Sequence, residues 1–378
     1  MMRVRLVDTI EAVDSASWDS LGGDPLSTHA VLRAVERAAL PGVELRYATV
    51  EDADGRLAGA APLARIAIDG ERLTHGLFRW FIHAARTVRP GFLRTTLSLC
   101  GTPLSVGNPP VRIAPHAHAA AVLSALARAM VEHAKPGEAP WLVFKEFGLS
   151  DRPAAEAAFG NAHTGWLLAP SEPNAVLPIE WSSYEAYLAS LRSDYRYKIR
   201  KAARQFARAG CEVSVAPLAA YDSDLHRLYE AVLDRAAVQL ERLTPAFFVE
   251  LGKALGDRAW LLQFHCAGRV IGWVAMLLDG ERAYDLFHGI DYRENVRCAL
   301  YFNQLAEVIR CAIERGVRQL SLGQSTETSK ARFGARPVPL WIALRHRRRA
   351  VTRGMRAGRH ILFPTKQVPT RRVFREAG

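Results

Sequence analysis

Residues 259–334 constrain the fold more than any other stretch of this chain, because they follow one another as strands, a long helix and a further strand. Ala259–Cys266, Arg269–Leu278 and Glu281–His288 are apolar runs, and a short glycine-containing turn separates each run from the next. Runs joined in this way are typical of antiparallel hairpins. The stretch therefore predicts three antiparallel strands in series.

A helix and a buried strand are expected next. Asn295 can cap a helix that runs to about Arg315, where Gly316 provides a left-handed stop. Val317–Leu322 then returns as a strand, and a loop rich in hydroxyl side chains follows it, from Gly323 to Gly334. The order of these elements predicts an α+β domain.

This order, with two short motifs, resembles the FemAB-like tandem GNAT acyltransferases. In that family a strand ending in glycine leads into a lysine-containing segment closed by Phe-Gly, to which Gly323, Lys330 and Phe333-Gly334 are similar. Ser193–Lys201 resembles the basic helix that opens the family's second domain. The resemblance covers about 182–341 well and the first half in outline. It implies an α/β (α+β) chain of two tandem GNAT-like domains, each a mixed, mostly antiparallel sheet flanked by helices.

A weak internal repeat supports two tandem domains. Gly55–Gly59 and Gly268–Gly272 share the spacing of Gly, Arg, two apolar residues and Gly, and each lies at a hairpin between apolar strands. Two prolines in Pro170–Asn174 interrupt the pattern and mark the expected junction. We predict an N-terminal domain over 1–172, an acyltransferase domain over 173–344 and a basic tail over 345–378.

The turn before the long helix departs from the wider GNAT pattern. Acetyl-CoA enzymes usually have glycines there, because glycines let backbone N–H groups close on a pyrophosphate at a helix N-terminus. Val296 and Cys298 stand at those positions in this chain. Arg293 and Arg297 could still bind an anionic donor through their charge. The resemblance implies acyl-CoA as co-substrate and no metal, with aminoacyl-tRNA as the less favoured donor.

Acyl transfer to an amine needs a base, a donor for the oxyanion and a cation near the leaving group. His288 is the preferred base, and Asp285 on the same expected strand should face the opposite side by period two. The resemblance gives Lys330 a place in the active site. Tyr301 is a further catalytic candidate, and like Asn303 it could reach the same cleft or simply pack. Gly289 permits close approach of a substrate chain, and the other candidates for donor binding in this stretch are Asn303, Gln324, Ser325 and Arg332.

The net charge of +12 is concentrated in two places. From Trp341 onward eleven Lys and Arg face one acid, and Arg192, Arg196, Arg200, Arg204 and Arg208 recur every fourth residue on a helix expected over 183–209. That stripe is either a solvated helix face or a surface for a phosphate-rich ligand such as tRNA. The tail suggests an anionic membrane surface as a further partner.

Other features of the sequence indicate where in the cell the protein is located. The chain has no apolar stretch long enough to span a bilayer, and its start lacks a signal-peptide core, so we expect a cytoplasmic protein, peripheral to the inner membrane face at most. Its five cysteines form no C-x-x-C pair, which argues against a zinc knuckle. Phe78–Phe92 mixes aromatics with arginines and could cover an acceptor groove, rest at a membrane interface, or pack as a strand connection.

Two classes of function remain open from the sequence. The first is an N-acyltransferase that moves an acyl group to an amine of a sugar, peptide or cell-envelope precursor. The second is a non-catalytic protein that binds nucleic acid or an anionic membrane on a decayed GNAT scaffold. The loop that carries Lys330 favours the enzyme.

Overall fold

The computed structural model describes residues 2–69, 94–133, 139–236, 242–324, 327–364 and 371–375. Two compact units divide the chain. Unit 1 comprises Met1–Ser171, Ala236–Leu243 and Pro339–Thr365, and unit 2 comprises Glu172–Arg235, Thr244–Val338 and Lys366–Gly378. The predicted insertion Phe78–Phe92 lies outside the described residues.

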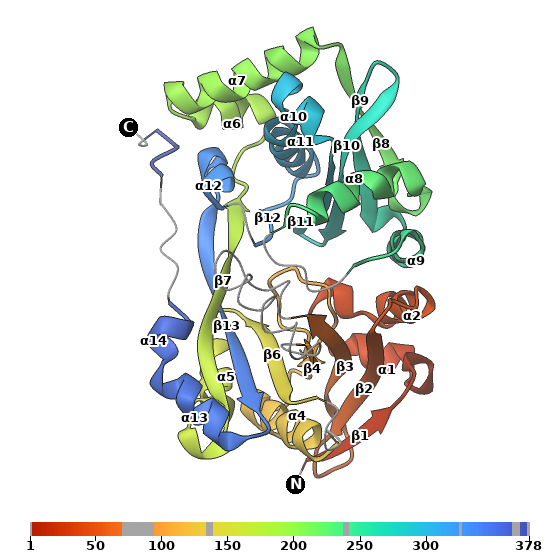
Figure 1. Ribbon diagram of the computed structural model, residues 1–378, viewed down its shortest axis with the longest axis vertical. Coiled ribbons are helices and arrows are strands. Elements are labelled where there is room, and N and C mark those ends of the chain that lie inside the picture. Colours follow the sequence, from red (N-terminus) through yellow and green to blue (C-terminus); the bar gives the residue numbers. More distant parts are fainter. Residues whose placement is uncertain are drawn as a thin grey trace, which may run out of the picture. The chain divides into compact units, whose positions relative to one another are not determined.

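Unit 1 is a sheet with helices packed against it (Figure 1). Its elements are β1 (Arg3–Val7), η1 (Ile10–Ala12), α1 (Ser15–Ser20), η2 (Pro25–Ser27), α2 (His29–Arg37), β2 (Val43–Glu51), β3 (Leu57–Asp69), β4 (Arg94–Cys100), β5 (Arg112–Ile113), α4 (Ala119–His133), β6 (Trp141–Phe147), α5 (Arg152–Phe159), η4 (Ala162–Thr164), α13 (Arg349–Ala357) and α14 (Arg359–Leu362).

Unit 2 is likewise a sheet with helices packed against it (Figure 1). Its elements are α6 (Tyr184–Ser190), α7 (Ser193–Arg208), β8 (Cys211–Pro217), η5 (Leu218–Ala220), α8 (Ser223–Leu233), α9 (Pro245–Leu255), η6 (Gly256–Arg258), β9 (Ala259–Cys266), β10 (Arg269–Asp279), β11 (Arg282–Ile290), α10 (Tyr292–Cys298), α11 (Leu300–Glu314), β12 (Gln319–Ser321), α12 (Glu327–Lys330) and η7 (Ala331–Phe333). β7 (Leu167–Pro178) and β13 (Arg336–His346) each have residues in both units.

The strands of the two units follow the same pattern. The order is β1-β2-β3-β4-β6-β13 in unit 1 and β8-β9-β10-β11-β12-β7 in unit 2. In each, only the fourth and fifth strands of this order run parallel, namely β4 with β6 and β11 with β12, and the other neighbours given a register are antiparallel. The predicted fold class, two tandem and mostly antiparallel α/β domains, is confirmed.

The Gly-Arg-x-x-Gly repeat has the same structure in both units. The first glycine of each copy lies in a hairpin turn and has a positive φ, which is 76° for Gly55 and 73° for Gly268. The strand register then shifts, so that one residue is skipped before Gly59 and before Gly272. A Cβ on Gly59 would lie 2.6 Å from Val122 of α4, and one on Gly272 would lie 2.8 Å from Gln304 of α11. Both glycines therefore let the following helix approach the sheet closely.

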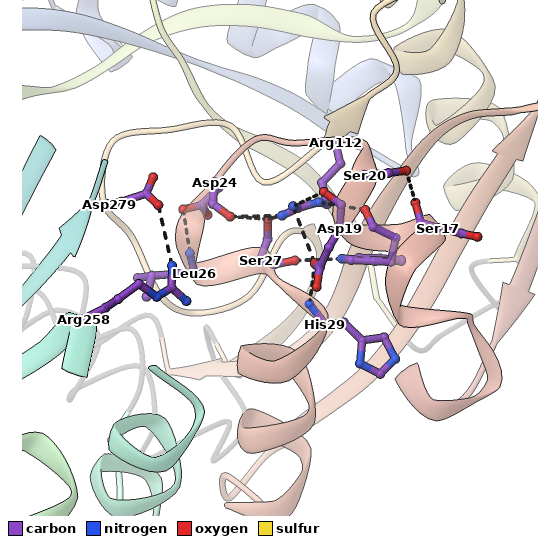
Figure 2. A network of polar contacts seen from close by, with 11 residues as sticks. Ser17, Asp19, Ser20, Asp24, Leu26, Ser27, His29, Arg112, Arg258 and Asp279 are labelled. Atoms are coloured by element: carbon purple, nitrogen blue, oxygen red, sulfur yellow. Dashed lines mark hydrogen bonds and ion pairs between the residues drawn. The ribbon is translucent and has the colours of Figure 1, made fainter. Parts of the chain in front are cut away.

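A buried arginine organises the helical start of unit 1. Arg112 is 3% exposed and donates to the backbone oxygens of Trp18, Asp24 and Asp19 and to the Ser27 hydroxyl, as Figure 2 shows in part. Side chains cap the short helices beside it: Asp14 accepts from the Ser17 amide at 2.7 Å, and Asp24 accepts from the Leu26 amide at 3.1 Å. A guanidinium can satisfy this many carbonyls because it carries five donors.

The structure refines two of the sequence predictions. Pro170–Asn174, the expected junction, contains the division between the units after Ser171 but lies inside β7, because the fixed φ of proline suits extended backbone wherever its missing N–H is not needed. The helix expected over 183–209 is two helices that break at Leu191 and Arg192. The C-terminal segment fills that break, since the Arg192 amide donates to the Val373 carbonyl at 2.9 Å.

The basic tail is likewise not a separate region. Its first part, up to Thr365, belongs to unit 1 and contains the end of β13 with α13 and α14, whereas Lys366–Gly378 belongs to unit 2. No helix in the described part of the chain is both long and apolar enough to cross a membrane.

Candidate active site

A β-bulge in β11 brings two predicted site residues together. Along the β10 pairing, Ala275 lies opposite Phe287 and Met276 lies opposite Asp285, so Leu286 has no partner in the register. The extra residue reverses the alternation of side chains, and Asp285 and His288 consequently face the same side. The prediction that they face opposite sides is wrong, because strict period two holds only for an unbulged strand.

Asp285 and His288 form a closely paired dyad. Nε2 of His288 lies 2.8 Å from Oδ1 and 2.9 Å from Oδ2 of Asp285. The Asp285 side chain is 1% exposed and the His288 side chain 17% exposed. Because the carboxylate holds the Nε2 proton, the lone pair or the exchangeable proton of the ring is at Nδ1. The dyad can therefore orient an imidazole that still reaches solvent.

Gln304, which sequence reasoning missed, completes this arrangement. It is fully buried on α11, and its Nε2 donates to the backbone oxygens of Trp273 and Gly289 at 3.2 and 3.0 Å. These bonds turn its Oε1 toward Nδ1 of His288, at 3.3 Å. An amide oxygen only accepts, so this contact is a hydrogen bond only when Nδ1 carries a proton; a ring protonated at Nε2 alone has its lone pair at Nδ1 and can accept a proton there.

The signal for Gln304 was present in the helix pattern. Leu300, Gln304 and Val308 recur every fourth residue, and all three are fully buried. A polar side chain on the buried stripe of a helix needs a specific partner. Tyr301 also lies at the dyad, with its ring 5.6 Å from the His288 ring and close to edge-on.

Gly289 has a different neighbour from the one predicted. A Cβ at this position would lie 2.0 Å from Nε1 of Trp273. The glycine therefore makes room for the Trp273 indole, which donates to the Leu225 carbonyl at 2.8 Å, and not for a substrate chain.

The ladder between β11 and β12 stops just before the dyad. Their parallel pairing covers Arg282–Tyr284, whereas β11 runs on to Ile290. The chain leaves β12 for Gly323, which has a positive φ of 72° and whose Cβ position lies 3.8 Å from the Asp285 carbonyl oxygen. Backbone groups of β11 beyond this point can therefore serve a ligand, as an oxyanion donor must.

Lys330 holds the loop that begins at Gly323. Its Nζ donates to the backbone oxygens of Gly323 and Gln324 at 3.2 and 2.9 Å, and the residue is 4% exposed. Lys330 was expected in a loop, but it ends the short helix α12 and is buried. Its charge therefore fixes the loop beside Asp285.

The turn between α10 and α11 is already occupied by protein groups. Oδ1 of Asn295 accepts from the Tyr301 amide at 2.8 Å, so a side chain bonds to the first turn of α11. Ala299 breaks the expected single helix with a left-handed φ of 52°, Cys298 is buried, and Val296 is 82% exposed. A pyrophosphate cradle of the usual GNAT kind does not fit this turn.

The remaining predicted donor residues differ in their surroundings. Arg293 is exposed, while Arg297 is paired with Glu294 at 2.5 Å and contacts the Cys266 sulfur at 2.8 Å. Asn303 is buried and donates to the carbonyls of Ala202, Cys298 and Ala299, so it joins α11 to its neighbours rather than facing a cleft.

Three further candidates lie elsewhere on unit 2. Arg196 donates to the carbonyls of Ala189 and Leu191, Arg200 pairs with Glu185 at 3.2 Å, and the Gln324 side chain donates to the Glu172 carbonyl. Arg332 is exposed. Ser325 lies outside the described residues. Within the described ranges, no three His, Cys, Asp or Glu side chains are arranged to hold a metal ion.

Comparisons with known proteins agree with this architecture. Residues 193–331 match the family described as acetyltransferase (GNAT) domain. The fold is similar to that of FemX, with a TM-score of 0.54 and 12% identity over 89% of this chain and 96% of that chain. A tandem GNAT protein from the clavulanic acid biosynthesis pathway gives a TM-score of 0.53 and 14% identity over 92% and 99% of the two chains.

L-PGS from Bacillus licheniformis has a similar fold as well, with a TM-score of 0.50 and 10% identity over 92% of this chain and 96% of that chain. None of the curated proteins matches the chain. The predicted resemblance is confirmed: residues 193–331 form a GNAT domain, and the chain as a whole has a FemAB-like tandem GNAT fold.

Proposed function

We propose that this protein is an N-acyltransferase that moves an acyl group from acyl-CoA to an amine of a sugar, peptide or cell-envelope precursor. The observation that carries the proposal is the Asp285–His288 dyad, which lies where the β11–β12 ladder ends inside the GNAT domain. A partly exposed imidazole beside strand backbone that lies beyond the β11–β12 ladder combines a proton carrier with an oxyanion donor.

The roles follow from the contacts. Asp285 orients His288 through Nε2, and Nδ1, when it carries no proton, takes the proton of the attacking amine and passes it to the departing sulfur. The amine nitrogen forms the new bond to the acyl carbon, the bond from that carbon to the donor sulfur breaks, and the amine's proton passes to the departing sulfur. Lys330 is a positioning residue, because it holds Gly323 and Gln324 in place.

Two observations bear on the donor. The similar tandem GNAT protein of the clavulanic acid pathway is described without AcCoA, which names AcCoA as a ligand for that protein and favours a CoA thioester here. The Asn295 side chain, which bonds to the first turn of α11, and the pairing of Arg297 with Glu294 argue for a donor held differently from a standard CoA pyrophosphate. Aminoacyl-tRNA therefore remains the second candidate donor. Arg196 and Arg200 on α7 are the residues that would contact it.

A donor panel tests the activity. The purified chain is given acyl-CoA thioesters with amine acceptors, and separately charged tRNA with and without ribonuclease, and products are detected by mass spectrometry. We expect transfer from a CoA thioester with no RNA present. Product that disappears with ribonuclease would move the assignment to aminoacyl-tRNA, and the absence of product from every donor would favour the non-catalytic reading.

Variants of the dyad test the residues. We expect His288→Asn and Asp285→Asn to lower kcat by roughly 10²–10⁴-fold, because each removes the proton carrier or its orientation. His265→Asn is the matched control, since His265 is a half-buried strand histidine bonded to Ser214 at 2.8 Å. Equal losses in His265→Asn and His288→Asn would contradict the assignment.

A further inference from the structure

The helices α13 and α14 form a small basic and apolar surface on unit 1. Between Trp341 and Pro364 the sequence contains seven arginines and no acidic residue. The same stretch carries Ile361 and Leu362, which are 86% and 56% exposed. Neither Ile361 nor Leu362 takes part in the proposed acyl transfer, so the exposure of these two side chains needs another explanation.

One side of this helix pair is fastened to unit 1. The Thr352 hydroxyl is buried and accepts from the His346 amide at 2.9 Å. Arg356 donates to the backbone oxygens of Gly160 and Trp166. These contacts fix the orientation of α13, and they leave Arg349 and Arg353 exposed.

The exposed side chains of α13 and α14 include both arginines and apolar residues, a combination that is rare on a surface facing water. Arg353 and Arg359 are exposed, and the apolar Ile361 and Leu362 follow directly in the chain after Arg359 and His360. A solvated helix face has no use for exposed branched apolar side chains, whereas an interfacial helix places such side chains among lipid tails and arginines at the headgroups. The absence of acids makes the surface complementary to a negatively charged layer.

We propose that the outer surface of α13 and α14 binds an anionic lipid bilayer, with Ile361 and Leu362 entering the headgroup–acyl boundary and Arg353 and Arg359 contacting lipid phosphates. The proposal goes beyond acyl transfer and does not depend on it. It places unit 1 at a membrane surface without any spanning segment. Two changes should each weaken binding to the bilayer. Added salt screens the charges of the arginines, and truncation of Ile361 and Leu362 removes an apolar contribution that salt does not screen.

Vesicle sedimentation with the full chain tests the proposal. The probes are vesicles of phosphatidylcholine alone and of phosphatidylcholine with phosphatidylglycerol, at low and high salt. We expect binding only to the phosphatidylglycerol vesicles, and roughly tenfold or greater weakening in Ile361→Ser/Leu362→Ser. Val215→Ser is the apolar control, since Val215 is 62% exposed on β8 of unit 2. It should bind like the parent chain.

The charge contribution has its own matched pair. Arg353→Gln/Arg359→Gln and Arg204→Gln/Arg208→Gln change the net charge equally, and all four arginines are exposed. We expect the first pair to weaken vesicle binding roughly tenfold and the second to leave it within about twofold. Equal effects of the two pairs would mean non-specific attraction and overturn the proposal.

RNA provides the decisive comparison. A surface that binds RNA rather than lipid would lose affinity with the arginine variant but not with Ile361→Ser/Leu362→Ser, because phosphate contacts need no apolar wedge. Vesicle binding unchanged in the Ile361→Ser/Leu362→Ser variant overturns the proposal, as does equal binding to neutral and anionic vesicles. Circular dichroism and the unfolding midpoint of each variant confirm that the compared chains are folded.

Discussion

At the scale of single residues, a buried carboxyl in unit 1 links stability to pH. Asp24 is 9% exposed and caps η2 by accepting from the Leu26 amide. Burial raises the pKa of Asp24 from 3.8 to about 7; the Leu26 hydrogen bond lowers it, and the charge of Glu146 raises it. Figure 2 shows Asp24 beside Arg112 in this network.

The sign follows from proton linkage. Between the two pKa values the folded chain keeps the Asp24 proton and the unfolded chain has lost it, so the free energy of unfolding falls as pH rises from about 4 to about 7. A shift of about 3 pKa units corresponds to ~4 kcal/mol. In Asp24→Asn this fall is absent, and the stability of the variant relative to the parent should rise by up to that amount across the same window. Urea unfolding at several pH values measures the difference.

Asp14→Asn is the control with the opposite sign. Hydrogen bonds from Ser17 lower the pKa of Asp14, which caps α1 at the surface. Its carboxylate stabilises the fold above its unfolded pKa, and this stabilisation is lost as pH falls. A stability difference between Asp24→Asn and the parent that stays constant from pH 4 to pH 8 would contradict the role of Asp24.

Sequence reasoning identified the residues of the candidate site better than their arrangement. Asp285, His288 and Tyr301 were named, and the structure brings them together. Their relation was missed because a bulge depends on how a strand packs, which alternation in the sequence does not record. Lys330 was named for its motif, but its burial depends on carbonyls of Gly323 and Gln324 that no pattern reveals.

At the scale of elements, the glycine repeat makes a sharp prediction about helix packing. A Cβ on Gly59 would lie 2.6 Å from Val122 and 3.0 Å from the Arg112 carbonyl oxygen. We expect Gly59→Ala to lower the free energy of unfolding by about 1–3 kcal/mol, because α4 must move away from β3. Val122→Ala should recover part of this loss in the double variant, which a double-mutant cycle measures.

Gly354→Ala is the matched control. This glycine lies inside α13, and a Cβ there would have no atom within 4 Å. The substitution should stabilise the chain by about 0.4–1 kcal/mol, because alanine restricts the unfolded state and suits a helix. If Gly59→Ala stabilised the chain to the same degree, close approach of α4 would not be the reason for the glycine.

Element order was predictable where local signals agreed with packing. β9, β10 and β11 begin within a residue of the predicted runs, since hairpin turns and apolar alternation both specify them. The helix over 183–209 was predicted whole because its apolar face continues unbroken through Leu188, Leu191 and Ile199. Its break depends on a β-bridge between Leu191 and Phe374, a contact of long sequence separation that local patterns do not contain.

At the scale of the whole molecule, the basic C-terminus is structural as well as charged. Composition predicted a basic tail over 345–378 that is separate from the two domains. In the structure Val373 is 1% exposed, and the Phe374 ring lies 5.2 Å from Trp181 and fills the space above Gly334, where a Cβ would be 2.2 Å from the ring. The segment is therefore part of the core of unit 2.

Ending the chain at Pro364 should consequently destabilise unit 2. The truncation exposes Leu191 and Tyr187 and leaves the backbone groups of Ser190 and Arg192 without Arg375 and Val373. We expect Phe374→Ala alone to cost about 2–3 kcal/mol, below most of the range for a fully buried phenylalanine because Phe374 is half-buried, and Phe374→Leu to cost less.

The charge and packing explanations can be separated in one experiment. Arg371→Gln/Arg375→Gln removes charge but keeps Phe374, and both arginines are exposed, so its unfolding midpoint in urea should stay near that of the parent. Phe374→Ala keeps the charge and should unfold at lower urea. Amide exchange at Leu191 and Arg192 should accelerate in Phe374→Ala but not in the arginine variant, because these amides lie where the segment bridges the α6–α7 break. The reverse pattern would show that charge, not burial, holds the C-terminus in place.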